Sequence, residues 1–467
     1  MRDPMEGSGI VTSIRISHNP SDNIYNIIGQ KALQTKSGIQ LGLYDSVDMR
    51  DGKPASVRKL SDKAMYGQML SESMQAVDIE ANSSRIIAGG KKYWSVSGTI
   101  IERLKDAAHL LVKGFVAGAP IVVRFHNDGD GATGAIALHR ALSELQERLF
   151  DGERSVSWSM NRSIAYTLES FYSDRMVFES YESAERPIVV ITDFGTSPES
   201  LDAIRASQGV CDIIWLDHHM PYDGFPREMV THYINSCDLG ADSNFTAGLL
   251  SCIFAQVLAG VDVEDLKDAA LVSDYSAYAD FGNKDALRIS IILDYITSRG
   301  SEADSKPRRM DAIIKDSGES ERVFRHASEL MDEAISYGIK NASTYINSDA
   351  VRICVLDFTP IARSRADYPL PGRYSSKLQS RLESINNGRT VTIVHYGNYV
   401  SIRVSSDIGE KVDILGIIER LKDMSHGLAT GGGHRQAASI RTDREHIDET
   451  IRMLLAELGI GATGGSA

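Results

Sequence analysis

The sequence has few cysteines, no excess of basic residues and no long apolar run, and each absence excludes a class of protein. Its 4 cysteines form no Cys-x-x-Cys pair, which argues against a zinc ribbon, a thioredoxin-type site and a disulfide framework. Acidic residues outnumber basic ones by 63 to 50, so a cationic surface that coats nucleic acid is not expected. The most apolar stretch, residues 110–125, is broken by charged residues, glycine and proline, and it falls short of the roughly 20 apolar residues that span a bilayer.

What remains is the composition of an ordinary globular protein, with 42% apolar and 24% charged residues. Charged residues follow Met1 directly and no secretion signal is recognisable, which together with the few cysteines favours a cytoplasmic protein. The 467 residues predict two or three domains, at roughly 150 residues per domain.

The pattern along the chain predicts an α/β protein. Residues 1–97 read as a small β-containing module of unknown role, with strands at 9–16 and 38–44. Residues 98–300 alternate between helix and apolar strand, which is typical of a parallel sheet covered on both faces. The expected elements are a helix at 99–118, strands at 121–125, 188–192 and 212–216, and a helix at 245–260.

A second, smaller α/β domain is predicted at 341–461. Its expected elements are strands at 351–358, 389–397 and 399–406 and helices at 413–424 and 445–458. Residues 301–340 are expected to be a linker and a connecting helix, with the polar segment 298–310 as the best linker candidate, and 462–467 a flexible tail.

Acidic residues and histidines follow the apolar elements of the first domain. They are His126, Asp128 and Asp130 after the first strand, Asp193 after the second, Asp217, His218 and His219 at the end of the third, and Asp274 at the end of the run 269–274. Ligands bind parallel sheets beyond the carboxyl ends of the strands. Carboxylates and imidazoles bind divalent cations, and a shared carboxylate joins two of them about 3.5 to 4 Å apart. The pattern therefore predicts a two-metal site.

Neighbouring glycines and a helix expected to begin near Ala132 favour a bound phosphate, because glycine allows close approach and a helix amino end attracts anions. Each motif alone also has an ordinary explanation. An Asp-x-Asp pair caps helices or turns, an Asp-His-His run occurs in surface turns, and Asp193 before Phe194 and Gly195 could begin a plain turn. The coincidence of all four motifs favours a site.

These motifs resemble the DHH phosphoesterase superfamily, and more closely its RecJ-like branch with the archaeal RecJ-like nucleases. The resemblance covers roughly residues 98–460. It rests on HNDGDGATGA (126–135), ITDFG (191–195), LDHH (216–219), VSDYSAYAD (272–280) and GGGHRQAAS (431–439), the last resembling the DHH-associated C-terminal domain.

The resemblance implies roles for the first group of residues. His126 and Asp128 would hold one cation, Asp130, His218 and Asp274 the other, and Asp193 would bridge both. His219 would face the scissile phosphate, and Asp217 would orient a neighbouring histidine. The implied cofactors are two divalent cations, Mn²⁺ preferred or Mg²⁺. Asp280 is an alternative to Asp274.

The resemblance also implies a substrate-binding pocket in the second domain, formed by Gly431, Gly432, Gly433 and His434. The segment 361–377 interleaves Arg363, Arg365, Arg373 and Lys377 with Tyr368 and Tyr374, a pattern suited to binding a nucleic-acid backbone and stacking bases. Arg403 is a further candidate for binding phosphate. A solvated glycine-rich loop, a charged surface loop and a surface arginine are the respective alternatives.

The function expected from these residues and the resemblance is an exonuclease on single-stranded DNA or RNA that releases nucleoside monophosphates, with its substrate in a cleft between the DHH domain and the DHH-associated domain. One alternative is a phosphodiesterase or phosphatase acting on short oligonucleotides, cyclic dinucleotides or nucleoside bisphosphates. Another is a non-catalytic replication or repair scaffold. A replication or repair protein is a plausible partner, oligomer formation is left open, and no membrane is involved. The run KKYW (91–94) hints at nucleic-acid binding by the first module.

Overall fold

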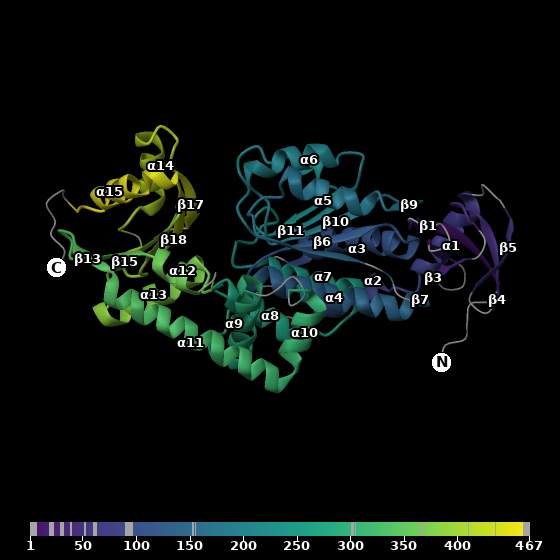
Figure 1. Ribbon diagram of the computed structural model, residues 1–467, viewed down its shortest axis with the longest axis horizontal. Helices are drawn as coiled ribbons and strands as arrows, with labels where there is room; N and C mark the ends of the chain where they lie inside the picture. Colours follow the sequence, from purple (N-terminus) through teal and green to yellow (C-terminus); the bar gives the residue numbers. More distant parts are fainter. Residues whose placement is uncertain are drawn as a thin grey trace. The chain divides into compact units, whose positions relative to one another are not determined.

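The computed structural model of the chain folds into two compact units, residues 1–320 and 321–467 (Figure 1). The structure describes residues 7–17, 23–28, 32–37, 40–50, 53–58, 63–88, 97–151, 154, 156–299, 303, 305–365, 368–409, 411–434 and 436–460. Within these ranges, no helix is long and apolar enough to cross a membrane. The KKYW run and the tail at 462–467 lie outside the described residues. The finer domain boundaries and the cleft remain predictions.

The N-terminal part of the first unit is an antiparallel sheet with additions from later in the chain. Its strand order is β5-β4-β1-β2-β3-β7, with β9 paired to β1. The strands are β1 (Gly7–Arg15), β2 (Ile24–Ile28), β3 (Ala32–Lys36), β4 (Ser46–Arg50), β5 (Lys53–Arg58), β7 (Phe150–Asp151) and β9 (Tyr181–Ser183). The strand predicted at 9–16 is confirmed. The one predicted at 38–44 is wrong in its described part, where Asp45 accepts the N–H of Gly42 at 2.7 Å and closes a turn.

Three helices follow this sheet: α1 (Lys63–Met74), α2 (Ile79–Ala88) and α3 (Ser97–Ala117). The last confirms the helix predicted at 99–118. It ends at Gly118, whose φ of +75° lies in the left-handed region that glycine tolerates. The Asn26 side chain donates to the carbonyl oxygen of Val116 at 3.1 Å, so the end of α3 is fixed against β2.

A parallel sheet forms the centre of the first unit, with strand order β12-β11-β10-β6-β8. Its strands are β6 (Ile121–His126), β8 (Ser157–Asn161), β10 (Ile188–Thr192), β11 (Asp212–Asp217) and β12 (His232–Asn235). The three strands predicted from apolar runs are confirmed, and their side chains are almost all buried. β8 and β12 were not predicted, because their sequences SWSMN and HYIN contain no apolar run.

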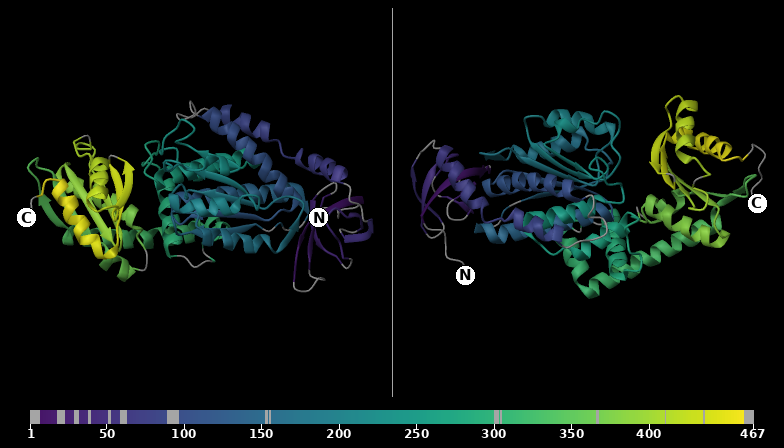
Figure 2. Two further views of the ribbon diagram at one scale, coloured as in Figure 1. Left: turned by 90° about the horizontal axis from the view of Figure 1, so that it is seen from above. Right: turned by 180° about the vertical axis from the view of Figure 1, so that it is seen from behind.

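Helices cover both faces of this sheet, as its apolar strands predict (Figures 1 and 2). Helices α5 (Leu168–Phe178) and α6 (Leu201–Ser207) pack on one face, around the buried Trp215. Helices α4 (Gly129–Leu149) and α7 (Ala247–Ala259) pack on the other, and α7 confirms the helix predicted at 245–260.

Three more helices complete the first unit: α8 (Glu264–Ser273), α9 (Lys284–Arg299) and α10 (Pro307–Lys315). Short 3-10 turns lie at Pro198–Ser200 and Arg227–Met229. The linker predicted at 298–310 is wrong at its ends, because α9 includes Ser298 and Arg299 and α10 begins at Pro307. The guanidinium of Arg140 binds Asp311 at 2.7 Å and fastens α10 to α4.

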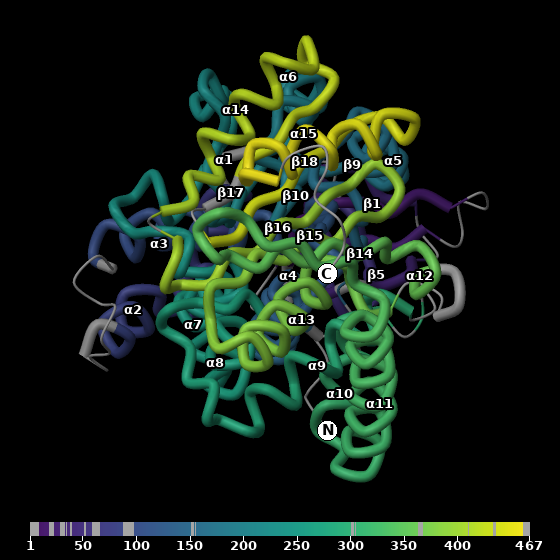
Figure 3. The backbone as a smooth tube through the Cα atoms, turned by 90° about the vertical axis from the view of Figure 1, so that its left-hand side faces the viewer, coloured from purple at the N-terminus to yellow at the C-terminus, as the bar shows by residue number. Residues whose placement is uncertain are grey.

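The second unit begins within α11 (Ser317–Asn341) and contains a mixed sheet of order β13-β14-β15-β16-β18-β17. Its strands are β13 (Ser343–Ile346), β14 (Arg352–Asp357), β15 (Thr390–Tyr396), β16 (Tyr399–Val404), β17 (Thr430–His434) and β18 (Ala437–Arg441). Its other helices are α12 (Thr359–Arg365), α13 (Pro371–Asn386), α14 (Ile414–Met424) and α15 (Ile447–Glu457), and a short 3-10 turn lies at Arg444–His446. Helices α14 and α15 pack on one face of the sheet and α13 on the other (Figure 3). The three strands and two helices predicted here are confirmed, as is the α/β class.

Candidate metal centre

The carboxyl ends of β6, β10 and β11 lie side by side, which brings three of the sequence motifs to one sheet edge. Thr192 of β10 pairs with Phe125 of β6 and with Leu216 of β11. The next residues on the three strands are therefore His126, Asp193 and Asp217 at the same level of the sheet. The structure thus gathers these side chains as the sequence predicts.

The first group of ligand atoms belongs to His126, Asp128 and Asp193. One atom from each lies within 4.8 Å of the others. The Nδ1 atom of His126 lies 2.7 Å from the Asp128 carboxylate and 3.9 Å from that of Asp193. Gly131 allows this tight strand-to-helix turn, because a Cβ atom there would lie 2.6 Å from the carbonyl oxygen of His126.

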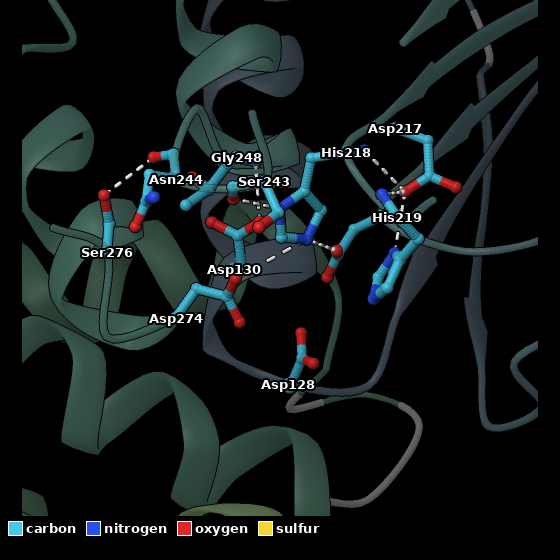
Figure 4. Close-up of polar contacts among 12 residues, drawn as sticks. Asp128, Asp130, Asp217, His218, His219, Ser243, Asn244, Gly248, Asp274 and Ser276 are labelled. Atoms are coloured by element: carbon cyan, nitrogen blue, oxygen red, sulfur yellow. Dashed lines mark hydrogen bonds and ion pairs between the residues drawn. The ribbon is translucent and has the colours of Figure 1, made fainter. Parts of the chain in front are cut away.

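The second group surrounds His218, whose Nε2 atom lies 3.4 Å from Asp193 and 3.5 Å from Asp274 (Figure 4). Its Nδ1 atom lies 2.7 Å from the carbonyl oxygen of Ser243. Because a carbonyl oxygen can only accept, Nδ1 carries a proton and Nε2 faces the carboxylates. Asp130 lies beside this histidine in Figure 4 and accepts the N–H of Gly248 at 2.9 Å.

Asp193 is the residue that the two groups share. Its φ of +70° lies in the left-handed region, which non-glycine residues seldom adopt. The backbone is held there by hydrogen bonds to β11: the N–H of Asp193 donates to Leu216 O at 3.0 Å, and Trp215 Nε1 donates to Phe194 O at 2.8 Å. The carboxylate is therefore fixed between the groups.

Asp217 supports the two histidines of the DHH motif. Its Oδ1 atom accepts the backbone N–H of His218 at 2.8 Å and that of His219 at 3.2 Å. The same oxygen lies 2.8 Å from Nδ1 of the His219 ring, whose side chain is 54% exposed. The structure therefore places Asp217 behind the centre and the His219 ring at its solvent side.

Crowding of negative charge controls the titration of the centre. Burial raises the pKa of Asp193 well above its usual range, and Asp128, Asp130 and Asp274 raise it further. Burial and the neighbouring Asp274 raise the pKa of Asp130 to about 7. Burial opposes a charge on His218, but Asp274 and Asp130 outweigh it and raise the pKa of His218 to about 9. Without cations, the centre thus holds protons that ordinary carboxyl groups would have lost.

The donor set fits divalent cations. The buried atoms Asp130 Oδ1, Asp193 Oδ2 and His218 Nε2 have no hydrogen-bond partner within the described part of the chain. Buried polar atoms are normally satisfied, so their convergence calls for a cation. The four carboxylates Asp128, Asp130, Asp193 and Asp274 would carry a charge of about −4, which two divalent cations would balance.

The start of α4 differs from the prediction. The helix begins at Gly129, three residues before the expected Ala132, with Asp128 as its N-cap. The N–H of Gly131 donates to Asp128 at 3.0 Å, and that of Gly129 donates to the buried Asp294 at 2.8 Å. The chain's own carboxylates therefore occupy these two amides, and a phosphate at the start of this helix remains a prediction.

Asp274, rather than Asp280, lies with the other ligands. Asp280 lies in the following turn, where its carboxylate accepts the N–H of Gly282 at 2.9 Å. Sequence reasoning missed the supporting residues Ser243, Gly248 and Asp294. The turn-forming run ADSN before α7 was the one local signal for Ser243, and Asp294 is concealed in an amphipathic helix.

The second unit holds the candidates for substrate binding. Gly431, Gly432, Gly433 and His434 form the edge strand β17, hydrogen-bonded to β18, and not a loop. Arg373 is buried in α13, and Arg403 on β16 donates from Nε to Ser376 Oγ at 3.0 Å. Their role in substrate binding remains a prediction.

The prediction that Tyr368 and Tyr374 stack bases is wrong. Tyr368 is 1% exposed and Tyr374 is fully buried, with its hydroxyl donating to Ala334 O at 3.1 Å. Their rings are packed inside the unit and present no face to a base. The side chains of Arg363 and Arg365 lie outside what the structure describes, and Lys377 is exposed on α13.

Comparisons with known proteins bear on the fold. No family model matches the chain. The uncharacterized protein MJ1198 of Methanocaldococcus jannaschii is 22% identical over 466 residues, which cover 87% of this chain and 60% of that protein. The chain therefore spans about 60% of the length of this curated relative.

Among solved structures, a DHH domain described as a member of the s1p family of ribosomal proteins matches with a TM-score of 0.67 and 19% identity, covering 85% of this chain and 99% of that one. RecJ from Thermus thermophilus, in complex with Mn²⁺, matches with a TM-score of 0.49 and 15% identity, covering 76% and 54%. The chain therefore shares the fold of the DHH domain that it matches at a TM-score of 0.67, in agreement with the DHH resemblance that its motifs carry.

Proposed function

We propose that the protein is a phosphodiesterase dependent on two divalent cations, and more specifically an exonuclease that degrades single-stranded DNA or RNA to nucleoside monophosphates. The observation that supports this is the position of Asp193, whose two carboxylate oxygens lie 3.4 Å from His218 and 3.9 Å from His126. Two cations that act together on one phosphate require a carboxylate shared between them, and Asp193 lies where such a carboxylate is needed.

The ligands divide between two cations along the two groups. His126 and Asp128 would hold one cation, His218, Asp130 and Asp274 would hold the other, and Asp193 would contribute to both. Bound Mn²⁺ or Mg²⁺ would lower the pKa of water and neutralise charge on the phosphate. The carbonyl oxygen of Ser243 accepts from Nδ1 of His218, so the nitrogen that would lose its proton and face the cation is Nε2.

His219 is suited to donate a proton to the leaving oxygen. Partial loss of water around its half-exposed ring opposes a charge, but Asp217 outweighs this effect and raises the pKa of His219. Asp217 fixes Nδ1, so Nε2 on the opposite side of the ring is free of that contact and its proton can be transferred. No side chain is required as a nucleophile, and hydrolysis proceeds without a covalent intermediate.

The second unit contributes substrate binding in this proposal. The edge strand carrying Gly431 to His434 offers backbone amides to phosphate groups, and Arg403 and Arg373 add positive charge. A protein with a net charge of −13 that binds a polyanion through cations and a few arginines should show a shallower salt dependence than a basic groove. A replication or repair protein is a further partner that fits this function, and formation of an oligomer is also compatible with it.

Hydrolysis assays test the proposal. Purified protein with Mn²⁺, Mg²⁺ or EDTA is incubated with end-labelled single strands of DNA and RNA, blocked at either end, and with matched duplexes. We expect mononucleotide release from single strands that requires a cation and stops at one blocked end. Cleavage limited to short oligonucleotides, cyclic dinucleotides or bisphosphates would favour the narrower phosphodiesterase. Intact substrates throughout would contradict an enzymatic role and leave the scaffold.

A further inference from the structure

The loop between α8 and α9 exposes three aromatic side chains beside the metal centre. Tyr275, Tyr278 and Phe281 are 40%, 37% and 52% exposed. The rings of Tyr275 and Phe281 lie 6.0 Å apart with an interplanar angle of 35°. Clustered exposed aromatic residues commonly mark a binding surface. This cluster directly follows Asp274, whose carboxylate is 3.5 Å from His218 Nε2.

Hydrogen bonds hold the backbone of this loop in place. Ser276 Oγ donates to the carbonyl oxygen of Asn244 at 2.7 Å (Figure 4). The N–H of Ala277 donates to Asn244 Oδ1 at 2.6 Å. At the other end, Asn283 donates to Asp268 at 3.0 Å. The rings are therefore carried by a fixed backbone. Less conformational entropy is lost when such a loop binds a ligand than when a flexible loop does.

The same short segment positions the loop and a ligand of the metal centre. Asn244 fixes Ser276 and Ala277, while the preceding Ser243 accepts from Nδ1 of His218. The place of the aromatic rings is thus coupled to the place of the ligand. A group bound on the rings would be held in a defined position relative to a phosphate at the cations.

The chemistry of the loop selects its occupant. In a nucleotide, the base is attached to the sugar beside the phosphate, so a phosphate at the cations brings its base to the adjoining surface. Stacking on aromatic rings needs no positive charge, which suits a protein with a net charge of −13. Bases in a duplex are stacked on each other and hide their faces, whereas unpaired bases expose them.

We propose that Tyr275, Tyr278 and Phe281 form a stacking platform for an unpaired nucleobase next to the phosphate held at the metal centre. This inference rests on the proposed function and adds to it a physical reason for preferring single strands.

The test compares Tyr278→Ala and Phe281→Ala with the ring-preserving Tyr278→Phe. Tyr275 is left intact because it adjoins Asp274 and has a φ of +52°, so its replacement would disturb a ligand. The matched control is Tyr172→Ala, because Tyr172 is 52% exposed on α5, a helix that contributes no ligand. Each variant is assayed with Mn²⁺ on a labelled single strand and on the same strand with an abasic terminal nucleotide.

The alanine variants should raise KM for the normal strand about 5- to 150-fold, the range expected for losing a stacked base, with little change on the abasic strand. Tyr278→Phe and Tyr172→Ala should match the wild type. Unchanged KM in both alanine variants of an active enzyme would overturn the platform while the proposed function stands.

Binding is measured in parallel, because it does not depend on turnover. A fluorescent adenine analogue in the strand should be quenched by the wild type in the presence of Mn²⁺ and less by Phe281→Ala. Equal quenching by both would overturn the platform. If the wild type quenches the analogue but hydrolyses nothing, the platform stands and the proposed catalytic function fails.

Discussion

Replacing Asp193 with asparagine should remove activity and yet stabilise the metal-free protein. Asparagine has nearly the shape of aspartate and tolerates left-handed backbone better than most residues, so it suits the φ of +70°. Alanine would add backbone strain of about 1 kcal/mol or more and confuse the result. Since both groups of ligands lose a member, turnover with Mn²⁺ should fall by at least about 100-fold.

The stability change follows from the raised pKa of Asp193. A carboxyl group with an unfolded pKa of about 3.9 needs up to about 4 kcal/mol to be protonated at pH 7, since each pH unit corresponds to about 1.4 kcal/mol. Folding without cations imposes this cost, because burial and then the neighbouring carboxylates raise the pKa of Asp193. The penalty is absent below about pH 4 and grows as the pH rises toward the folded pKa. The metal-free variant should therefore exceed the wild type in stability at pH 7, by at most about 4 kcal/mol.

Thermal unfolding in EDTA and in Mn²⁺, together with turnover, measures both effects. Mn²⁺ should raise the melting temperature of the wild type and have little effect on Asp193→Asn. Asp311→Asn is the matched control. Burial opposes ionisation of Asp311, but Arg140 and Lys315 lower its pKa, so its replacement should reduce stability and keep the response to Mn²⁺. If Asp193→Asn retains turnover, or destabilises the metal-free protein as Asp311→Asn does, the reasoning is refuted.

Three further predictions concern cation and substrate binding. The apparent Mn²⁺ affinity should rise at least about tenfold from pH 6 to pH 8, because Asp130 and His218, with pKa values of about 7 and about 9, must lose protons to bind a cation; a pH-independent calorimetric titration would contradict this. Asp294→Ala should weaken Mn²⁺ binding about tenfold, because the Asp294 carboxylate accepts the N–H of Gly129 at 2.8 Å beside the centre. Excess Mn²⁺ should then restore turnover. Turnover that stays low in excess Mn²⁺ would show that Asp294 has a purely structural role. His434→Ala should raise KM more than it lowers kcat, and a pure loss of kcat would instead place His434 among the catalytic groups.

The convergence of the candidate metal ligands could be predicted because each follows a segment whose structure is locally determined. The runs IVVRF, IVVIT and DIIWL are apolar throughout most of their length, which leaves them little alternative to a buried parallel strand. Parallel strands place their carboxyl ends at one edge, so the residues after them must approach each other. The edge strands β8 and β12 lack such runs and were not predicted. The segment 38–44 has the alternating pattern of a strand, but its described part forms a turn closed by Asp45.

The supporting contacts could not be predicted, because they join residues that are distant in sequence. Asp294 meets Gly129 across 165 positions, and no local pattern links the two. Tyr374 shows a different error, in which a local sequence pattern predicts exposure and the side chain is buried. It lies among arginines in the sequence, but the helical period of α13 turns it toward the core, while the exposed Lys377 lies on the same helix. Only the three-dimensional packing separates the side chains that face solvent from those that do not.

The unfavourable features of the centre are concentrated at Asp193, and the fold keeps them there. Left-handed backbone at a non-glycine residue and a buried carboxylate among other carboxylates are each destabilising. Two hydrogen bonds hold this arrangement, from Asp193 N–H to Leu216 O and from Trp215 Nε1 to Phe194 O. Both hydrogen bonds involve the neighbouring strand β11, which also ends in Asp217. The Asp193 carboxylate, which we propose bridges the cations, and the DHH motif are therefore positioned by one rigid element. In the proposed function, cations would therefore meet ligands that are already in place, and their binding would relieve the repulsion that folding alone leaves uncompensated.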